Sequence, residues 1–204
     1  MALTNQVTKN SIHFFLKSLA LLVLVSAISG CANTAQTLKP APKEGVSVKG
    51  INLLFISIPF KVKDNPSSDI QVTHNPDPIK ERLRDEVGQK VPPQFKKKGI
   101  ATNFASVDVT PGVAASSIKE LFPKDSLDMH LLTITPLSSK VQCNGGSCST
   151  SYTISVSLRT PNENKELWNL QLQQGELKLA DWISSGNDSL INDIVKNVLM
   201  VVHP

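Results

Sequence analysis

Alternating and continuous runs of apolar residues predict the strands of this chain. Residues 48–60 carry apolar side chains at odd and even positions alike, which is typical of a central strand with both faces covered. Residues 152–159 instead alternate between apolar or aromatic side chains and hydroxyl-bearing or charged ones, the period of a sheet with one face in water. Further strands are predicted over residues 100–109, 127–136 and 166–179.

Apolar residues three and four positions apart predict a long helix after the first strand. It should begin at Pro78 with Asp77 as its N-cap, since Asp accepts hydrogen bonds from the free N–H groups there and Pro has none to satisfy. Its apolar stripe consists of Ile79, Leu83, Val87 and Val91. Pro92-Pro93 is expected to end or kink this helix, with one further turn over residues 94–98.

Two more helices complete the predicted order. A short one is expected over residues 113–122, and Asn187 or Asp188 should cap the last one. The buried face of the last helix would consist of Leu190, Ile191, Ile194, Val195, Val198 and Leu199. The order β-α-β-α-β-β-β-α predicts an α+β fold, a single mixed sheet of about five strands with about three helices packed on it.

The first 30 residues have the pattern of a signal peptide. Lys9 and Lys17 are their only charged residues, and an apolar stretch of eleven residues covers positions 18–28. A transmembrane helix needs about 20 such residues, whereas the apolar core of a signal peptide has about 7–15. We therefore expect residues 1–30 to be removed from the mature protein.

The apolar stretch ends in Ile28-Ser29-Gly30-Cys31, which resembles the lipobox of bacterial lipoproteins. This resemblance implies that Cys31 becomes the acylated first residue, and several acyl chains give a stable membrane anchor. Ala32 follows, where lipoproteins retained in the inner membrane commonly have Asp, so the resemblance implies the outer membrane. The predicted organisation is a signal peptide (1–30), a polar, Pro-rich flexible tether (31–46) and a periplasmic αβ domain (47–204).

The predicted element order also resembles a family of envelope domains. The stretch Ser117–Thr135, where a short helix leads into a central strand, and the order over roughly residues 48–202 are similar to the TolB N-terminal and CsgG-like domains. That group includes the lipoprotein activators of peptidoglycan synthases. The resemblance implies a mixed sheet with packed helices, and a protein that binds other envelope components without catalysing a reaction.

Composition and charge exclude further classes of protein. The chain has 204 residues, 40% of them hydrophobic, which is too many for a disordered protein. Its 21 basic and 17 acidic residues give a net charge of +4, and removal of Lys9 and Lys17 leaves 19 against 17, or +2. Together with the export signal, this small charge argues against a nucleic-acid partner.

Two cysteines close together mark a hairpin between the predicted third and fourth strands. Cys143 and Cys148 flank Asn144, Gly145, Gly146 and Ser147, and paired glycines suit a tight turn. In an exported protein we expect these cysteines to form a structural disulfide. A redox pair or a metal site is the alternative, although redox pairs usually have Cys-x-x-Cys spacing at a helix N-terminus. The pinned tip is a candidate binding loop.

The histidines and nucleophiles show no catalytic or metal-binding pattern. His13, His74, His130 and His203 are scattered, without the spacing of a ligand cluster, so neither a metal nor another cofactor is expected. Ser116 and Lys119 match the Ser-x-x-Lys motif of penicillin-binding enzymes, but the partner motifs Ser-Asp-Asn and Lys-Thr-Gly are absent from the sequence. No enzymatic activity is therefore predicted.

The basic run Lys96, Lys97 and Lys98 lies near the end of the predicted long helix. Positive charges at the end of a helix interact favourably with the helix dipole, and these lysines could also contact lipid phosphates or glycan carboxylates. The predicted function is a non-enzymatic adaptor in an envelope assembly or maintenance complex, with an envelope protein as partner. Two alternatives stay open: a lipid or transport accessory, and a small cell-wall hydrolase. The sequence does not fix the oligomeric state.

Overall fold

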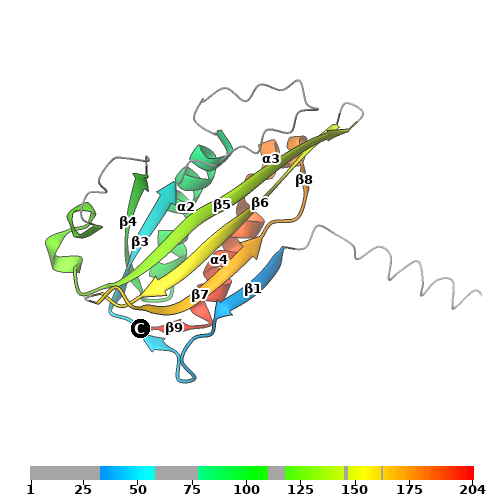
Figure 1. Cartoon of the computed structure of the whole chain (residues 1–204). Coiled ribbons are helices and arrows are strands. Elements are labelled where there is room, and N and C mark those ends of the chain that lie inside the picture. Colours follow the sequence, from blue (N-terminus) through cyan, green and yellow to red (C-terminus); the bar gives the residue numbers. More distant parts are fainter. Residues whose placement is uncertain (1–32, 58–77, 110–117, 145–146, 162) are drawn as a thin grey trace, which may run out of the picture. The chain divides into compact units, whose positions relative to one another are not determined.

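A mixed β-sheet organises the part of the chain that the computed structural model describes, which is residues 33–57, 78–109, 118–144, 147–161 and 163–204 (Figure 1). Its strands are β1 (Thr34–Lys39), β3 (Gly50–Ser57), β4 (Ala101–Asp108), β5 (His130–Asn144), β6 (Ser147–Arg159), β7 (Glu166–Gln173) and β8 (Leu177–Lys178). They follow the order β1-β7-β6-β5-β3-β4, and β8 pairs with the far end of β6. Strand β3 runs parallel to both of its neighbours, and the other pairings are antiparallel.

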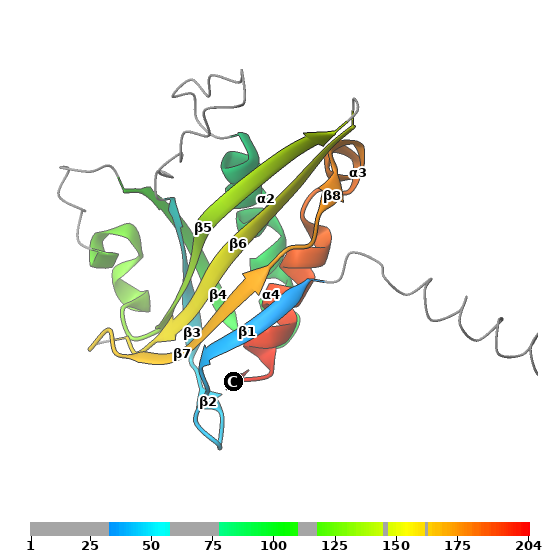
Figure 2. The same cartoon turned by 45° about the vertical axis from the view of Figure 1, so that its right-hand side comes forward.

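Helices α2 (Pro78–Lys96) and α4 (Asp188–Leu199) cover one face of this sheet, as Figures 1 and 2 both show. The sequence periodicity places their apolar residues inward, as expected. The helices contribute Leu83, Val87, Val91, Phe95, Leu190, Ile191, Ile194, Val195 and Val198 to the main core. The sheet supplies alternate residues of β3, β5, β6 and β7, including Trp168, to the same core. This face is therefore closed to solvent.

Helix α2 continues through its two prolines. Pro92 and Pro93 lie inside the helix, and neither can donate a hydrogen bond to the preceding turn. Phe95 follows them and is fully buried in the main core. Gly99, with φ of 78°, then ends the helical segment. The prolines thus do not end the helix, because the buried Phe95 side chain holds the last turn against the sheet.

Glu86 on α2 binds the backbone of the short connection between α3 (Leu179–Ser185) and α4. Its carboxylate accepts hydrogen bonds from Arg82 Nε at 2.7 Å and from the Asn187 backbone N–H at 2.7 Å, and Lys90 Nζ lies at 3.6 Å. Burial acts to raise the pKa of Glu86, but these hydrogen bonds and the nearby Lys90 charge lower the pKa below its ordinary 4.5. The charged carboxylate is therefore favoured by the folded state.

A second, parallel pair of strands joins the two ends of the described unit. Strand β2 (Val46–Ser47) pairs with β9 (Val202–His203). The Val46 N–H donates to Val201 O at 2.7 Å, and the Val48 N–H donates to His203 O at 2.9 Å. The C-terminal residues are thus bound to the segment that leads into β3.

The α+β class and the mixed sheet are confirmed, but the element count is not. Among the described residues, the main sheet has seven strands where about five were predicted, and two longer helices lie on it where about three were predicted. The segment predicted as one strand over residues 166–179 divides into β7 and β8, and α3 begins at its last residue. Of the short helix predicted over 113–122, the described part is a 3-10 turn, Ile118–Leu121, and residues 113–117 lie outside the described residues.

The prediction of an unpacked tether over residues 31–46 is wrong for its central part. Strand β1 pairs with β7 along the edge of the main sheet. Just before it, Asn33 Nδ2 donates to Asp193 Oδ2 at 2.6 Å and to Ser189 Oγ at 3.1 Å. The side chains of β1 are all exposed, so its hydrophobic pattern gives no strand signal. Its backbone hydrogen bonds and the Asn33 contacts hold it in place.

Candidate functional site

The second face of the sheet has two parts of different character. Over β3, β4 and β5, residues of the turn near Leu121 and Phe122 cover a small apolar cluster that includes Leu54 and Leu131. Over β6, β7 and β1, alternate positions instead carry hydroxyl and amide groups, and no helix of the described residues lies on them (Figures 1 and 2). We define the polar face as Gln36, Thr133, Thr135, Ser155, Ser157, Arg159, Glu166, Asn169 and Gln171.

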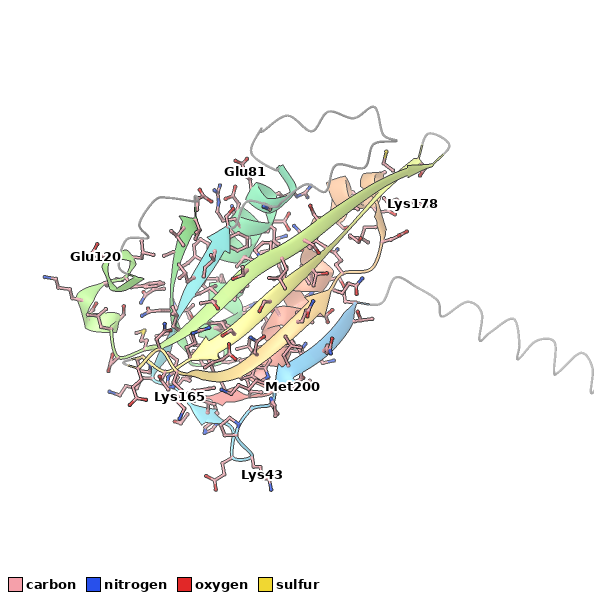
Figure 3. All side chains as sticks on the ribbon, viewed as in Figure 1. Lys43, Glu81, Glu120, Lys165, Lys178 and Met200 are labelled. Carbon is pink, nitrogen blue, oxygen red and sulfur yellow. The ribbon has the colours of Figure 1, made fainter. Side chains whose placement is uncertain are left out.

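The strand register brings the members of the polar face together. Ser157 pairs with Asn169, Ser155 pairs with Gln171, and Gln171 pairs on its other side with Gln36. Because side chains alternate along each strand, these residues point away from the helices while their neighbours fill the core. Several charged side chains, among them Lys43, Glu81, Glu120 and Lys178, lie at the outline of the folded unit in Figure 3. The polar face itself is mostly uncharged.

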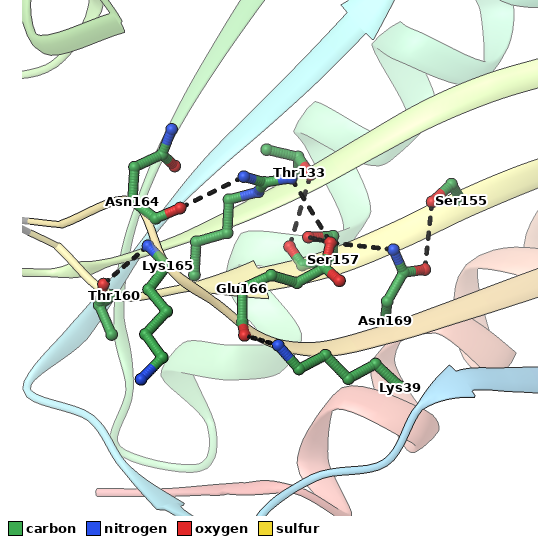
Figure 4. Close-up of polar contacts among 10 residues, drawn as sticks. Lys39, Thr133, Ser155, Ser157, Thr160, Asn164, Lys165, Glu166 and Asn169 are labelled. Carbon is green, nitrogen blue, oxygen red and sulfur yellow. Dashed lines mark hydrogen bonds and ion pairs between the residues drawn. The ribbon is translucent and has the colours of Figure 1, made fainter.

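Glu166 is the centre of a hydrogen-bond network on this face (Figure 4). Its Oε2 atom accepts hydrogen bonds from Asn169 Nδ2 at 3.0 Å and Ser157 Oγ at 3.2 Å, and it forms an ion pair with Arg159 Nη2 at 3.4 Å. Ser155 Oγ extends the network by donating to Asn169 Oδ1 at 3.4 Å. The network fixes the side chains in one arrangement, which lowers the entropy lost on binding a ligand.

A β-bulge directs Glu166 to this face. Leu158 pairs with Trp168, but the next residue, Arg159, pairs with Glu166, so β7 has one extra residue there. Strict alternation would have put Glu166 on the same side as the buried Trp168. The bulge is not visible in the sequence pattern, and no motif in the sequence indicates Arg159, Glu166 or Asn169 as members of a site. The adjacent charged residues Lys165 and Glu166, at the start of β7, were the only signal of this site in the sequence.

Lys39 and Arg159 hold the backbone at the border of the polar face. The Lys39 ammonium of β1 donates a hydrogen bond to the Glu166 backbone oxygen (Figure 4). Arg159 Nη1 donates to Asn164 O at 3.3 Å, in the turn between β6 and β7, where Asn164 has a φ of 52°. Asparagine tolerates this left-handed conformation better than most residues do. Side chains from three strands therefore fix the position of Glu166.

The structure places the predicted hairpin at the far end of β5 and β6. Cys143 and Cys148 are direct cross-strand partners, and Asn144 pairs with Ser147. Directly opposite Cα atoms in an antiparallel pair are about 4.5–5.5 Å apart, which lies within the range that a disulfide spans. The register thus suits a disulfide, which stays a prediction. Gly145 and Gly146 lie outside the described residues.

The other candidate residues do not join the polar face. Lys96, Lys97 and Lys98 are exposed at the end of α2, and no carboxylate of the described residues forms an ion pair with them. Cys31 and Ser116 lie outside the described residues, so neither lipidation nor the Ser-x-x-Lys pattern is tested.

The histidines that the structure describes do not gather into a site. His130 lies at the start of β5, where burial lowers its pKa. His203 belongs to β9, and His13 and His74 lie outside the described residues. Within the described ranges, no three His, Cys, Asp or Glu side chains gather as metal ligands would, and no helix is long and apolar enough to cross a membrane.

Comparison with known proteins finds similar solved structures but no matching family or sequence. No protein-family description and no curated protein sequence matches the chain. Among solved structures, it is similar to the PelC dodecamer from Paraburkholderia phytofirmans, at 12% identity over 82% of this chain and 95% of that chain, with a TM-score of 0.43. Protein XCC0632 from Xanthomonas campestris shows 14% identity over 82% and 91% of the two chains, with a TM-score of 0.43.

A bacterial lipoprotein is also among the similar structures. Lipoprotein GNA1162 from Neisseria meningitidis shows 12% identity over 74% of this chain and 95% of that chain, with a TM-score of 0.37. The resemblance of the element order to TolB N-terminal and CsgG-like domains stays a prediction.

Proposed function

We propose that this chain is a lipoprotein, anchored through acylated Cys31 in the outer membrane, whose folded unit is a non-enzymatic binding module in the periplasm. The observation that carries the proposal is the polar face around Glu166, which no helix of the described residues covers. The signal pattern ending at Cys31 supplies the location, and a protein of the envelope is the proposed partner.

The chemistry of the polar face suits a partner that offers both donors and acceptors. Its hydroxyl and amide groups can do either, while Glu166 accepts and Arg159 donates. Ser157 and Thr133 are buried, whereas other groups of the polar face, such as Gln36, are more accessible to a partner. A disulfide between Cys143 and Cys148 would stiffen the hairpin at the far end of β5 and β6, where Asn144, Gly145 and Gly146 would offer a second, separate contact.

Few residues of the chain separate the proposed anchor from strand β1. Only Ala32 and Asn33 separate Cys31 from the first residue of β1. A chain of three residues reaches at most about 10 Å, so the start of the sheet would stay near the lipid surface. The partner would then be a component that itself lies at or approaches the inner surface of the outer membrane.

Substitution of the proposed lipidation site tests the anchor. Cys31→Ala should abolish incorporation of a labelled fatty acid and move the protein from the membrane fraction to the soluble periplasmic fraction, because no other acyl acceptor is proposed. The measurement is metabolic labelling followed by fractionation of the cell envelope. Cys148→Ser serves as the matched control and should keep its label. Unchanged labelling of Cys31→Ala would contradict the anchor.

A photocrosslinking amino acid at Gln171 tests the polar face in intact cells. We expect one protein partner to be trapped from Gln171 but not from Asn192, an exposed position on α4. Glu166→Ala should lower that yield at least about tenfold, which corresponds to about 1.4 kcal/mol, because Asn169 and Ser157 lose their common acceptor. The exposed Glu163→Ala is the control. Equal trapping from both positions, or only lipid or glycan at Gln171, would exclude the proposed binding mode.

A further inference from the structure

Within the part of the chain that the structure describes, strand β4 is an edge strand without the features that usually protect an edge. It is the last strand of the main sheet, and among the described residues it pairs only with β3. Its register with β3 is regular over all eight residues, it contains no proline, and its only charge is Asp108 at the end. Proteins usually protect such edges with lysine, proline, bulges or a covering segment.

The opposite edge of the same sheet is protected. Strand β1 has a register shift between Thr37 and Lys39, it ends in a lysine, and Pro40 follows directly. These features disfavour addition of a further strand. The contrast between the two edges indicates that β4 is the edge strand that can pair with a further strand.

The hydrogen-bond pattern identifies the free groups on β4. The Val109 N–H donates to Ser57 O at 2.8 Å, so the odd-numbered residues of this strand point their backbone groups toward β3. Backbone groups alternate in direction along a strand, so Thr102, Phe104, Ser106 and Asp108 point theirs outward. A regular row of backbone donors and acceptors therefore faces away from the sheet.

Charge favours one direction and one kind of partner strand. The exposed lysines Lys96–Lys98 precede β4, separated from it only by Gly99 and Ile100, and the exposed Asp108 ends it. A parallel copy of β4 would bring the two lysine runs together, whereas an antiparallel copy brings each Asp108 to the lysine end of the other strand. Antiparallel pairing of two identical strands also has two-fold symmetry, which makes both contacts equal.

We infer that β4 pairs with β4 of a second copy of this chain, antiparallel about a two-fold axis. The centre of the strand lies at Phe104 and Ala105. Residues opposite each other in an antiparallel pair both direct their backbone groups to the partner strand or both away from it, so the axis passes at one of these two residues and not between them. The two main sheets would then join into one. The inference is independent of the anchor and of the polar face, because β4 and β1 lie at opposite edges of the sheet. It also gives Lys96–Lys98 a role at the ends of the interface.

Crosslinking of the full chain in intact cells tests this pairing. Ser106→Cys is exposed and near the axis, so a short bis-maleimide should give a dimer band that is absent for Lys196→Cys, an exposed position on α4. Adding Thr102→Pro removes one outward N–H and should lower the dimer fraction at least fivefold, whereas Thr102→Val keeps that N–H and should not. The melting temperature of each variant shows whether the fold is retained.

If Thr102→Pro fails to fold, Asp108→Lys provides the second variant, because it places like charges at both ends of the interface. A dimer that depends on these residues supports the inference. An undiminished dimer in a folded Thr102→Pro variant, a crosslink only to another protein, or no crosslink from Ser106→Cys would overturn it.

Discussion

Replacing Phe95 with alanine is expected to lower the free energy of unfolding by about 3–5 kcal/mol. The side chain is fully buried and packs in the main core behind the sheet. It also holds the turn of α2 that follows Pro92 and Pro93, where two backbone hydrogen bonds of the helix cannot form. The cavity and the loosened turn should therefore act together.

Urea unfolding followed by far-UV circular dichroism measures this loss. Lys97→Ala is the matched control two residues further on, since its side chain is exposed, and it should change stability by less than about 0.5 kcal/mol. A loss below about 1 kcal/mol for Phe95→Ala would show that the last turn of α2 does not depend on this anchor.

Glu86→Ala is expected to cost about 1–3 kcal/mol at neutral pH. It leaves the Asn187 N–H at the corner before α4 and the Arg82 guanidinium without their common acceptor. Because the pKa of Glu86 is lowered in the folded state, its contribution is present above the ordinary value of 4.5 and is lost as the pH falls through the folded pKa. The stability difference between wild type and variant should therefore shrink on acidification below 4.5.

Chemical unfolding of both proteins at pH 7 and at several values below 4.5 checks this. Glu81→Ala on the same helix is the control, because Glu81 is exposed. If the difference between wild type and Glu86→Ala stayed constant across that range, the charge of Glu86 would not be what stabilises the corner.

The hydrophobic pattern predicted the elements whose side chains fill the core. Tyr152, Ile154, Val156 and Leu158 are buried as their alternation required, and the stripes of α2 and α4 face the sheet. Strand β1 was missed because no buried apolar side chain marks it, and every side chain on it is exposed. Hydrophobic periodicity cannot report such a strand.

The candidate site was harder to predict than the fold. The alternation along residues 152–159 correctly indicated that one face of the sheet is polar. It did not show which residues of β7 pair with these residues. The bulge between Glu166 and Trp168 shifts the alternation of β7 by one residue, and bulges depend on the pairing of two distant segments. The hydrogen bonds of Glu166 to Asn169 and Ser157 could therefore be found only in the structure.

The pairing of β1 with β7 also sets an order of events during biogenesis. Thr34 pairs with Gln173, which follows it by 139 positions (173 minus 34). At about 5–20 residues per second, β1 waits for about 7–28 s after it is made before its partner exists. During that delay β1 has no strand to join, so an enzyme acting at the proposed lipidation site, Cys31, would act before β1 is paired. Strand β1 is among the first segments made but pairs only after β7 is made, which would let the proposed modification precede folding.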